Sequence, residues 1–249
     1  MSWSLIADSD GFVNIGAGTE TFSLPAGLEE GDIVIVAMAA DTGGIAGGNI
    51  QTSGYQGVDT VGSSPSYTVK WKQMGATPDS DITFIQGGSR RFGWTYQVWR
   101  GGAKSGQPDA DFQVSNNDNP PSITTVADGA LVFAITVQDD DDAEVTSPPT
   151  GYSNLSFGNT GLGSAAFGGT AMIASKIVAS AGVEDPGPFT TNVNDSKASF
   201  TISFAPVAGP QAKRWNGSEW VDVVVTVWDG SQWTNAQFWS GDLNGWIQQ

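Results

Sequence analysis

Histidine and cysteine are both absent from this chain of 249 residues. Their absence excludes Ser-His and Cys-His nucleophilic pairs, zinc sites built from imidazole or thiolate groups, and disulfide bonds. Most enzyme mechanisms need at least one of these groups. We therefore expect a protein that is not an enzyme, and we expect no cofactor and no metal.

Positive charge is also scarce, with Lys+Arg 10 against Asp+Glu 26 and a net charge of −16. Nucleic-acid phosphates and anionic membrane surfaces would repel such a chain. No stretch approaches the length of about 18 apolar residues that a membrane-spanning helix needs. The first six residues lack the basic and apolar regions of a signal peptide. The sequence thus predicts no nucleic-acid partner, no membrane insertion and no secretion signal.

Residues that favour turns are abundant, with Gly 33, Pro 12, and twenty Asp against six Glu. Asp favours turns whereas Glu favours helix interiors, so this imbalance indicates strands joined by loops. Apolar residues alternate with polar ones in 67–72, 92–98 and 200–204. Alternation places the apolar side chains on one face of a strand, and in 67–72 it places the lysines on the other face.

Two continuous apolar runs, 33–37 and 130–137, are typical of central strands that are buried on both faces. A further strand is expected over 172–178. Clusters of Gly, Pro, Asn and Asp separate these runs, and helical periodicity is almost missing. The pattern predicts an all-β fold, an antiparallel β-sandwich of jelly-roll or immunoglobulin-like topology, with no helix longer than about two turns.

The composition changes near residue 207. Small residues and prolines over 205–210 end the last strand of the sandwich, and six of the ten Trp follow residue 210. This change predicts two domains, a β-sandwich of residues 1–207 and a small Trp-rich β-hairpin module of residues 208–249.

The C-terminal module repeats a short unit. Trp-Asn-Gly-Ser-Glu-Trp over 215–220 returns as Trp-Asp-Gly-Ser-Gln-Trp over 228–233, thirteen residues later. A third copy over 239–246 departs from the pattern, because its two tryptophans are seven residues apart rather than five. Asn-Gly and Asp-Gly flanked by aromatic residues are signals for tight hairpin turns. The repeat predicts a series of short hairpins.

This repeat resembles the units that end many minor tail and appendage proteins of tailed bacteriophages. The first domain is similar to phage virion β-sandwiches. The similarity rests on the segments 28–36, 92–101, 128–132 and 181–186. The resemblance implies a structural or receptor-facing role in a virion assembled in the host cytoplasm. It implies no catalytic residues. The partners expected from it are other virion proteins, further copies of the chain, and a host-surface glycan or receptor.

The tryptophans of the module are the first candidate site. Exposed indoles flanked by Asn, Asp and Gln can bind sugar rings by stacking, whereas indoles stacked on one another would form the core of the hairpins. We favour the core, with one or two rings left for assembly or glycan contact. The candidate residues are Trp215, Trp220, Trp228, Trp233, Trp239 and Trp246.

The acidic run Asp139, Asp140, Asp141 and Asp142 is the second candidate site. Four adjacent carboxylates repel one another, and a hard cation such as Ca²⁺ would relieve the repulsion. The spacing lacks the alternating ligands and the Gly of a dedicated calcium loop, so a solvated acidic loop is the favoured interpretation. Carboxylate pairs such as Asp109 with Asp111, or Glu184 with Asp185, raise glycoside hydrolysis as a weaker alternative.

The leading hypothesis is a non-enzymatic structural protein of a tailed bacteriophage virion, placed on a tail appendage or fibre. A capsid decoration protein or head fibre is the close alternative, since a sandwich with a trailing segment suits that role too. From another functional class, the alternative is a carbohydrate-binding module or a small glycan depolymerase.

Overall fold

The computed structural model describes residues 3–15, 18–41, 49–60, 65–86, 90–102, 108–161, 168–193 and 195–207, together with the short C-terminal ranges 212–215, 220–223, 226–228, 233–235, 239–242 and 245–248. The chain divides into two compact units, Ser2–Pro206 and Val207–Gln249. We call the first unit the body and the second the C-terminal segment. Every regular element in the described ranges is a strand, which confirms the all-β prediction. No helix long and apolar enough to cross a membrane occurs in these ranges.

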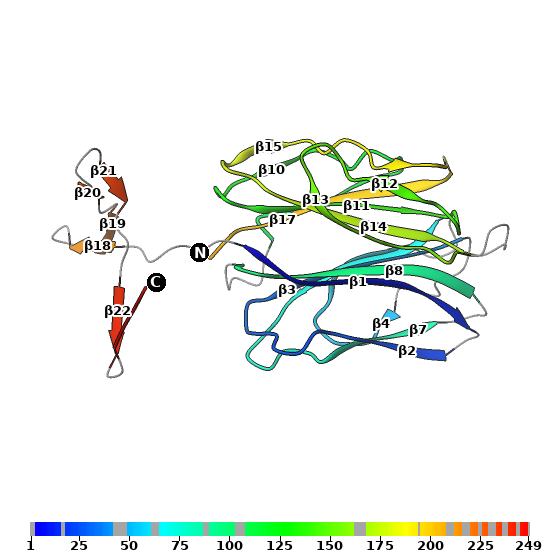
Figure 1. The fold of residues 1–249 in the computed structure, drawn as a ribbon, viewed down its shortest axis with the longest axis horizontal. Coiled ribbons are helices and arrows are strands. Elements are labelled where there is room, and N and C mark those ends of the chain that lie inside the picture. Colours follow the sequence, from blue (N-terminus) through cyan, green and yellow to red (C-terminus); the bar gives the residue numbers. More distant parts are fainter. Residues whose placement is uncertain are drawn as a thin grey trace. The chain divides into compact units, whose positions relative to one another are not determined.

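Two five-stranded antiparallel sheets form the centre of the body (Figure 1). The first sheet contains, in spatial order, β1 (Ser4–Ile15), β8 (Arg90–Arg100), β3 (Ile33–Ala40), β6 (Ser66–Gln73) and β5 (Gln56–Thr60). The second contains β9 (Ala110–Ser115), β17 (Lys197–Phe204), β11 (Leu131–Gln138), β14 (Thr170–Ile177) and β13 (Ser153–Gly158). The alternating and continuous apolar runs of the sequence lie on β3, β6, β8, β11, β14 and β17, as predicted.

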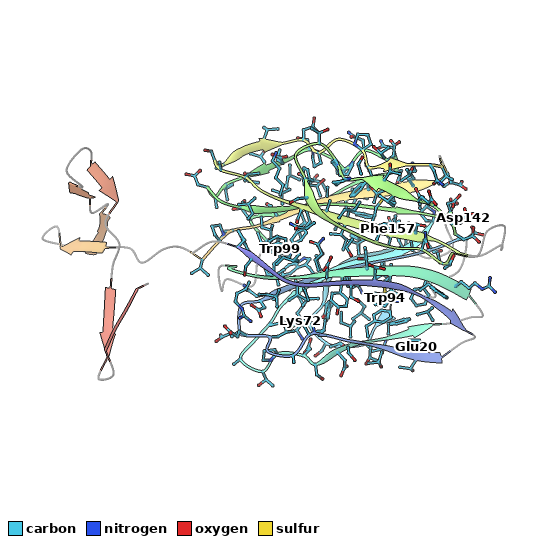
Figure 2. The ribbon with its side chains drawn as sticks, in the orientation of Figure 1. Glu20, Lys72, Trp94, Trp99, Asp142 and Phe157 are labelled. Carbon is cyan, nitrogen blue, oxygen red and sulfur yellow. The ribbon has the colours of Figure 1, made fainter. Side chains whose placement is uncertain are left out.

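The main core lies between these two sheets. Alternate side chains of β6 and β17 enter it, and Tyr67 and Phe200 meet edge to face with ring centroids 5.0 Å apart. Trp3 also belongs to this core, and its indole N–H donates to the carbonyl of Gly129 at 2.9 Å. Figure 2 places Trp99 in the same layer, where its ring packs against Phe133. The antiparallel β-sandwich is therefore confirmed.

Each five-stranded sheet carries a smaller β layer on its other face, so the body has four layers (Figure 1). The first is covered by β2 (Gly18–Ser23), β7 (Asp81–Gln86) and β4 (Asn49–Ile50). The second is covered by the pairs β10 (Ile123–Thr125) with β15 (Gly182–Glu184), and β12 (Val145–Ser147) with β16 (Thr190–Thr191). Two further apolar clusters fill these outer spaces, one around Phe22 and Phe92 and the other around Tyr152 and Met172.

The sequence predicts a single sandwich, and the outer layers are additional to it. They also change the expected surroundings of the lysines on β6. Lys70 and Lys72 on β6 point away from the main core as predicted, yet their side chains are only 14% and 16% exposed. Lys70 pairs with Asp59 at 2.7 Å, and Lys72 pairs with Asp79 at 2.6 Å. Neighbouring segments therefore cover this face of β6. Because the two ammonium groups are largely shielded from water, each is paired with a carboxylate.

The body consists of two halves with the same strand order. Numbered from one to eight, the strands of the first half form a sheet ordered 1-8-3-6-5 beneath an outer sheet ordered 2-7-4. In the second half, β9, β17, β11, β14 and β13 repeat the order 1-8-3-6-5, and β10, β15/β16 and β12 take the places of 2, 7 and 4. Strands 1-8-3-6 facing strands 2-7-4 follow the order of a jelly roll, and the fifth strand pairs with the sixth instead of joining the second sheet. The structure thus decides between the two predicted topologies, and it shows two jelly rolls where the sequence predicted one sandwich.

The hydrogen bonds of the two halves correspond as well. The N–H of Met74 donates to the carbonyl of Asp32 at 2.7 Å, and the N–H of Val178 donates to that of Ala130 at 2.9 Å. Both bonds extend the pairing of the third and sixth strands by one step, because Ile33 faces Gln73 and Leu131 faces Ile177. The register therefore assigns each residue of the third and sixth strands in one half to a residue of the other half.

A turn in the first half is fixed by a lysine on the neighbouring strand. Gly54 has a φ of +87°, which a glycine adopts without strain, and Tyr55 follows it at the entrance to β5. The ammonium of Lys72 lies 5.6 Å from the centre of the Tyr55 ring and donates to the carbonyl of Ser53 at 2.8 Å. Burial, followed by the charge of Asp79, raises the pKa of Tyr55 far above its ordinary value.

The second half repeats this arrangement. Gly151 has a φ of +84°, and Tyr152 follows it at the entrance to β13. The ammonium of Lys176 lies 5.6 Å from the Tyr152 ring and 2.7 Å from Glu184. Burial, followed by the charge of Glu184, raises the pKa of Tyr152 far above its ordinary value too. Two copies of one Gly-Tyr, Lys and acid cluster at matching places indicate that the halves are repeats of one structural unit.

Candidate functional site

The described ranges of the C-terminal segment form three antiparallel strand pairs, each a hairpin. They are β18 (Ala212–Trp215) with β19 (Trp220–Val223), β20 (Thr226–Trp228) with β21 (Trp233–Asn235), and β22 (Trp239–Asp242) with β23 (Gly245–Gln248). In the first hairpin Trp215 is the cross-strand partner of Trp220, and in the second Trp228 is the partner of Trp233. The repeated sequence unit therefore corresponds to a repeated Trp–Trp pair at the end of these two hairpins.

The third hairpin lacks such a pair. Trp239 faces Gln248, and Trp246 faces Gly241. Its closing pair is Asp242 with Gly245, because the two extra residues between the tryptophans move the turn away from them. The longer spacing between the tryptophans of the third copy thus goes with different cross-strand partners. The third copy still forms an antiparallel hairpin.

The side chains of the C-terminal segment lie outside the described part of the structure. The backbone register makes Trp215 and Trp220, and Trp228 and Trp233, cross-strand partners, and aromatic residues at such positions contribute to hairpin stability. Assembly or glycan contact by Trp215, Trp220, Trp228, Trp233, Trp239 and Trp246 stays a prediction.

The acidic run follows β11 at one end of the body, where Figure 2 labels Asp142. One oxygen from each of Asp140, Asp141 and Asp142 lies within 4.8 Å of the other two. Burial raises the pKa of Asp140, and the charges of Asp142 and Asp141 raise it further. The backbone of this loop is anchored, since the carbonyl of Asp141 accepts hydrogen bonds from the N–H of Gly161 at 2.8 Å and from the hydroxyl of Thr160 at 3.0 Å.

The charge of Asp140 offers a direct test of the favoured solvated loop against the alternative of a bound cation. The raised pKa means that ionised Asp140 costs folding free energy at neutral pH, and this cost disappears below the ordinary pKa of about 3.8, where the carboxyl is protonated in both states. We expect Asp140→Asn to raise the melting midpoint by about 1–2 °C at pH 7 and to leave it unchanged near pH 3. The Asn side-chain oxygen can still accept the hydrogen bond that Asp142 N–H donates at 3.0 Å.

Calcium separates the two interpretations of the loop. If the loop holds a cation, millimolar CaCl₂ raises the melting midpoint of the unaltered chain at pH 7 and has no such effect on Asp140→Asn. A solvated acidic loop responds equally weakly in both. Differential scanning calorimetry at matched ionic strength measures the difference.

The carboxylates considered for glycoside hydrolysis contact other parts of the body. Glu184 accepts from the ammonium of Lys176 and from the hydroxyl of Tyr152 at 3.2 Å. Asp109 accepts from the N–H of Val126 at 2.9 Å and from the hydroxyl of Ser203 at 3.4 Å. These contacts connect strands and loops, so both carboxylates have a structural role.

No protein-family model, curated protein or solved structure matches the chain. The resemblance to phage virion proteins therefore rests on the residues named in the sequence. The repeated hairpins and the duplicated jelly roll are the observations on which a function can be proposed.

Proposed function

We propose that this protein is a non-enzymatic structural component of a tailed bacteriophage virion, positioned on a tail appendage or fibre. In this proposal the body is a rigid spacer, and the C-terminal hairpins attach it to other virion proteins, to further copies of the chain, or to the host surface. The observation that carries the proposal is the repeated hairpin with a Trp–Trp pair, formed by Trp215 with Trp220 and by Trp228 with Trp233.

The body supports a mechanical role. None of the eight residues of β3 is more than 2% exposed, and the central sheets are covered on both faces. Dense packing of this kind resists deformation. Jelly rolls are frequent in viral capsid and lectin domains, although a fold alone does not determine a function. The charge of −16 favours solubility in a crowded assembly reaction.

Density-gradient purification of the phage that encodes this chain tests the proposal. We expect mass spectrometry to detect the chain in intact particles, and in tails after heads and tails are separated. Detection in the head fraction would instead support a capsid decoration protein or head fibre. Absence from particles would refute the virion role.

A further inference from the structure

The two halves of the body meet closely at one corner through glycine. A Cβ atom on Gly93 of β8 would overlap the carbonyl oxygens of Gly158 and Gly169 from the second half. The N–H of Gly93 donates to the carbonyl of Gly169 at 3.1 Å. A Cβ on Gly158 would overlap the backbone of Gly11 and Trp94. At this corner the halves are in backbone contact, and no side chain fits between them.

The repeat of the fold creates a second, equivalent corner. Gly93 faces Ala39 on the third strand, and Ala198 faces Val137 at the same place in the other half. Gly158 is equivalent to Thr60, because they face Ala171 and Tyr67 on the sixth strands. Gly169 is equivalent to Pro65, since each precedes the first residue of the sixth strand. Gly93, Gly158 and Gly169 of the closed corner are therefore all replaced by residues with side chains.

A cavity of about 460 Å³ lies at this second corner. Among the residues that the structure describes, Thr60, Pro65, Tyr67, Asn116, Ser196, Lys197 and Ala198 line it. The three substituted positions are among them, so the cavity stands where backbone contact closes the other corner. Its volume falls within the range of about 300–1,000 Å³ that is usual for small-molecule sites.

The lining offers several polar groups that can both donate and accept hydrogen bonds. Thr60, Tyr67 and Ser196 contribute hydroxyl groups, and Asn116 contributes an amide. None of these four side chains forms a hydrogen bond with another described residue. Pro65 and Ala198 add apolar surface beside them. Hydroxyl and amide groups next to an apolar wall are complementary to a sugar, which has hydroxyl groups and apolar C–H faces.

The charge around the cavity favours a neutral ligand. The Lys197 side chain is only 6% exposed, and its ammonium lies 3.9 Å from Asp118 and 3.4 Å from the hydroxyl of Thr191. The Lys197 ammonium is thus paired within the protein and does not favour an anionic ligand in the cavity. The net charge of −16 would repel an acidic sugar over longer distances.

We propose that the cavity between Thr60, Tyr67, Asn116 and Ser196 binds a neutral mono- or disaccharide unit of a surface glycan. This site lies on the body, apart from the tryptophans of the C-terminal segment. The proposal does not depend on the virion role, because sugar binding is measured on the purified chain.

Saturation-transfer NMR on the full chain tests the site, with glucose, galactose, rhamnose, N-acetylglucosamine and their disaccharides as probes. We expect transfer to at least one of these sugars. Ser196→Trp, at an exposed position of the lining, should weaken binding by about tenfold or more because the indole takes up space in the cavity. Tyr67→Phe removes one hydroxyl from the lining and should weaken binding about three- to tenfold.

Thr124→Trp is the matched control, since it adds the same side chain at an exposed position on β10 in the outer layer. It should bind like the unaltered chain, and all three variants should keep a cooperative melt. The proposal fails if none of the probes binds. It also fails if Ser196→Trp binds as well as Thr124→Trp, a result that would assign any sugar binding to another part of the chain.

Discussion

Gly93→Val is expected to destabilise the body by about 3 kcal/mol or more, which corresponds to a fall in melting midpoint of about 6–12 °C. The added side chain would overlap the carbonyl oxygens of Gly158 and Gly169. Both are backbone atoms of the opposing half, so they cannot rotate away as a flexible side chain would. The two central sheets must separate at this corner, which weakens the core between them. Thermal unfolding followed by circular dichroism measures the change.

Ala198→Val is the control at the equivalent position. Ala198 lines the open cavity, so two added methyl groups meet free space, and the change in stability should stay within about 1 kcal/mol. A similar loss in both variants would contradict the difference between the closed and open corners.

A chain that ends at residue 207 is expected to keep the cooperative melt of the body and to lose incorporation into particles. Among the described side chains, the three cores of the body contain residues from Trp3 to Phe204, and the truncation leaves all of these in place. The predicted boundary between residues 207 and 208 is tested by the same experiment. If the truncated chain aggregates or melts without cooperativity, the C-terminal segment belongs to the folding unit of the body.

Trp220→Ala combined with Trp233→Ala should reproduce the loss of incorporation in the full-length chain. Each substitution removes one partner of a cross-strand Trp pair, and such pairs contribute about 0.2–1 kcal/mol to hairpins that are marginally stable alone. Trp246→Ala is the control, because Trp246 faces Gly241 and has no indole opposite. Equal incorporation of the double variant and the unaltered chain, measured by quantitative mass spectrometry of particles, would rule out a role for these pairs.

Local sequence patterns were sufficient to predict the strands of the body. The alternation over 200–204 and the continuous run over 33–37 arise directly from which faces of β17 and β3 are buried. The hairpins of the C-terminal segment were also predictable, because Asn-Gly and Asp-Gly between tryptophans specify a turn within a few residues. Patterns of this kind need no knowledge of distant contacts.

The duplication of the jelly roll was not predicted. Its signal was present, since Glu30-Gly31 and Asp128-Gly129 each lead into a third strand, and Gly31 and Gly129 both have positive φ angles. The Gly-Tyr pairs at 54–55 and 151–152 and the lysines Lys72 and Lys176 also match, whereas the equivalent strands β3 and β11 differ at most positions, because only packing volume and register need to be kept. The polar residues buried on β17, such as Ser199 and Thr201, also gave no hint of the second covering layer.

The cavity could not be predicted from the sequence. Its described lining residues come from separate places in the sequence, namely 60, 65, 67, 116 and 196–198, and no local motif connects them. Only the comparison of equivalent corners shows that Thr60, Pro65 and Ala198 stand where the other corner has glycine. In contrast, Asp139 to Asp142 were visible in the sequence, and the structure brings three of their carboxylates together.

Immunogold electron microscopy of intact phage particles, with an antibody raised against the body, tests the central proposal most directly. The virion proposal predicts gold label on the tail or its appendages, and loss of that label from particles grown with the chain truncated after residue 207. Label confined to the capsid, or particles that carry no label while the chain is found free in the lysate, would contradict it.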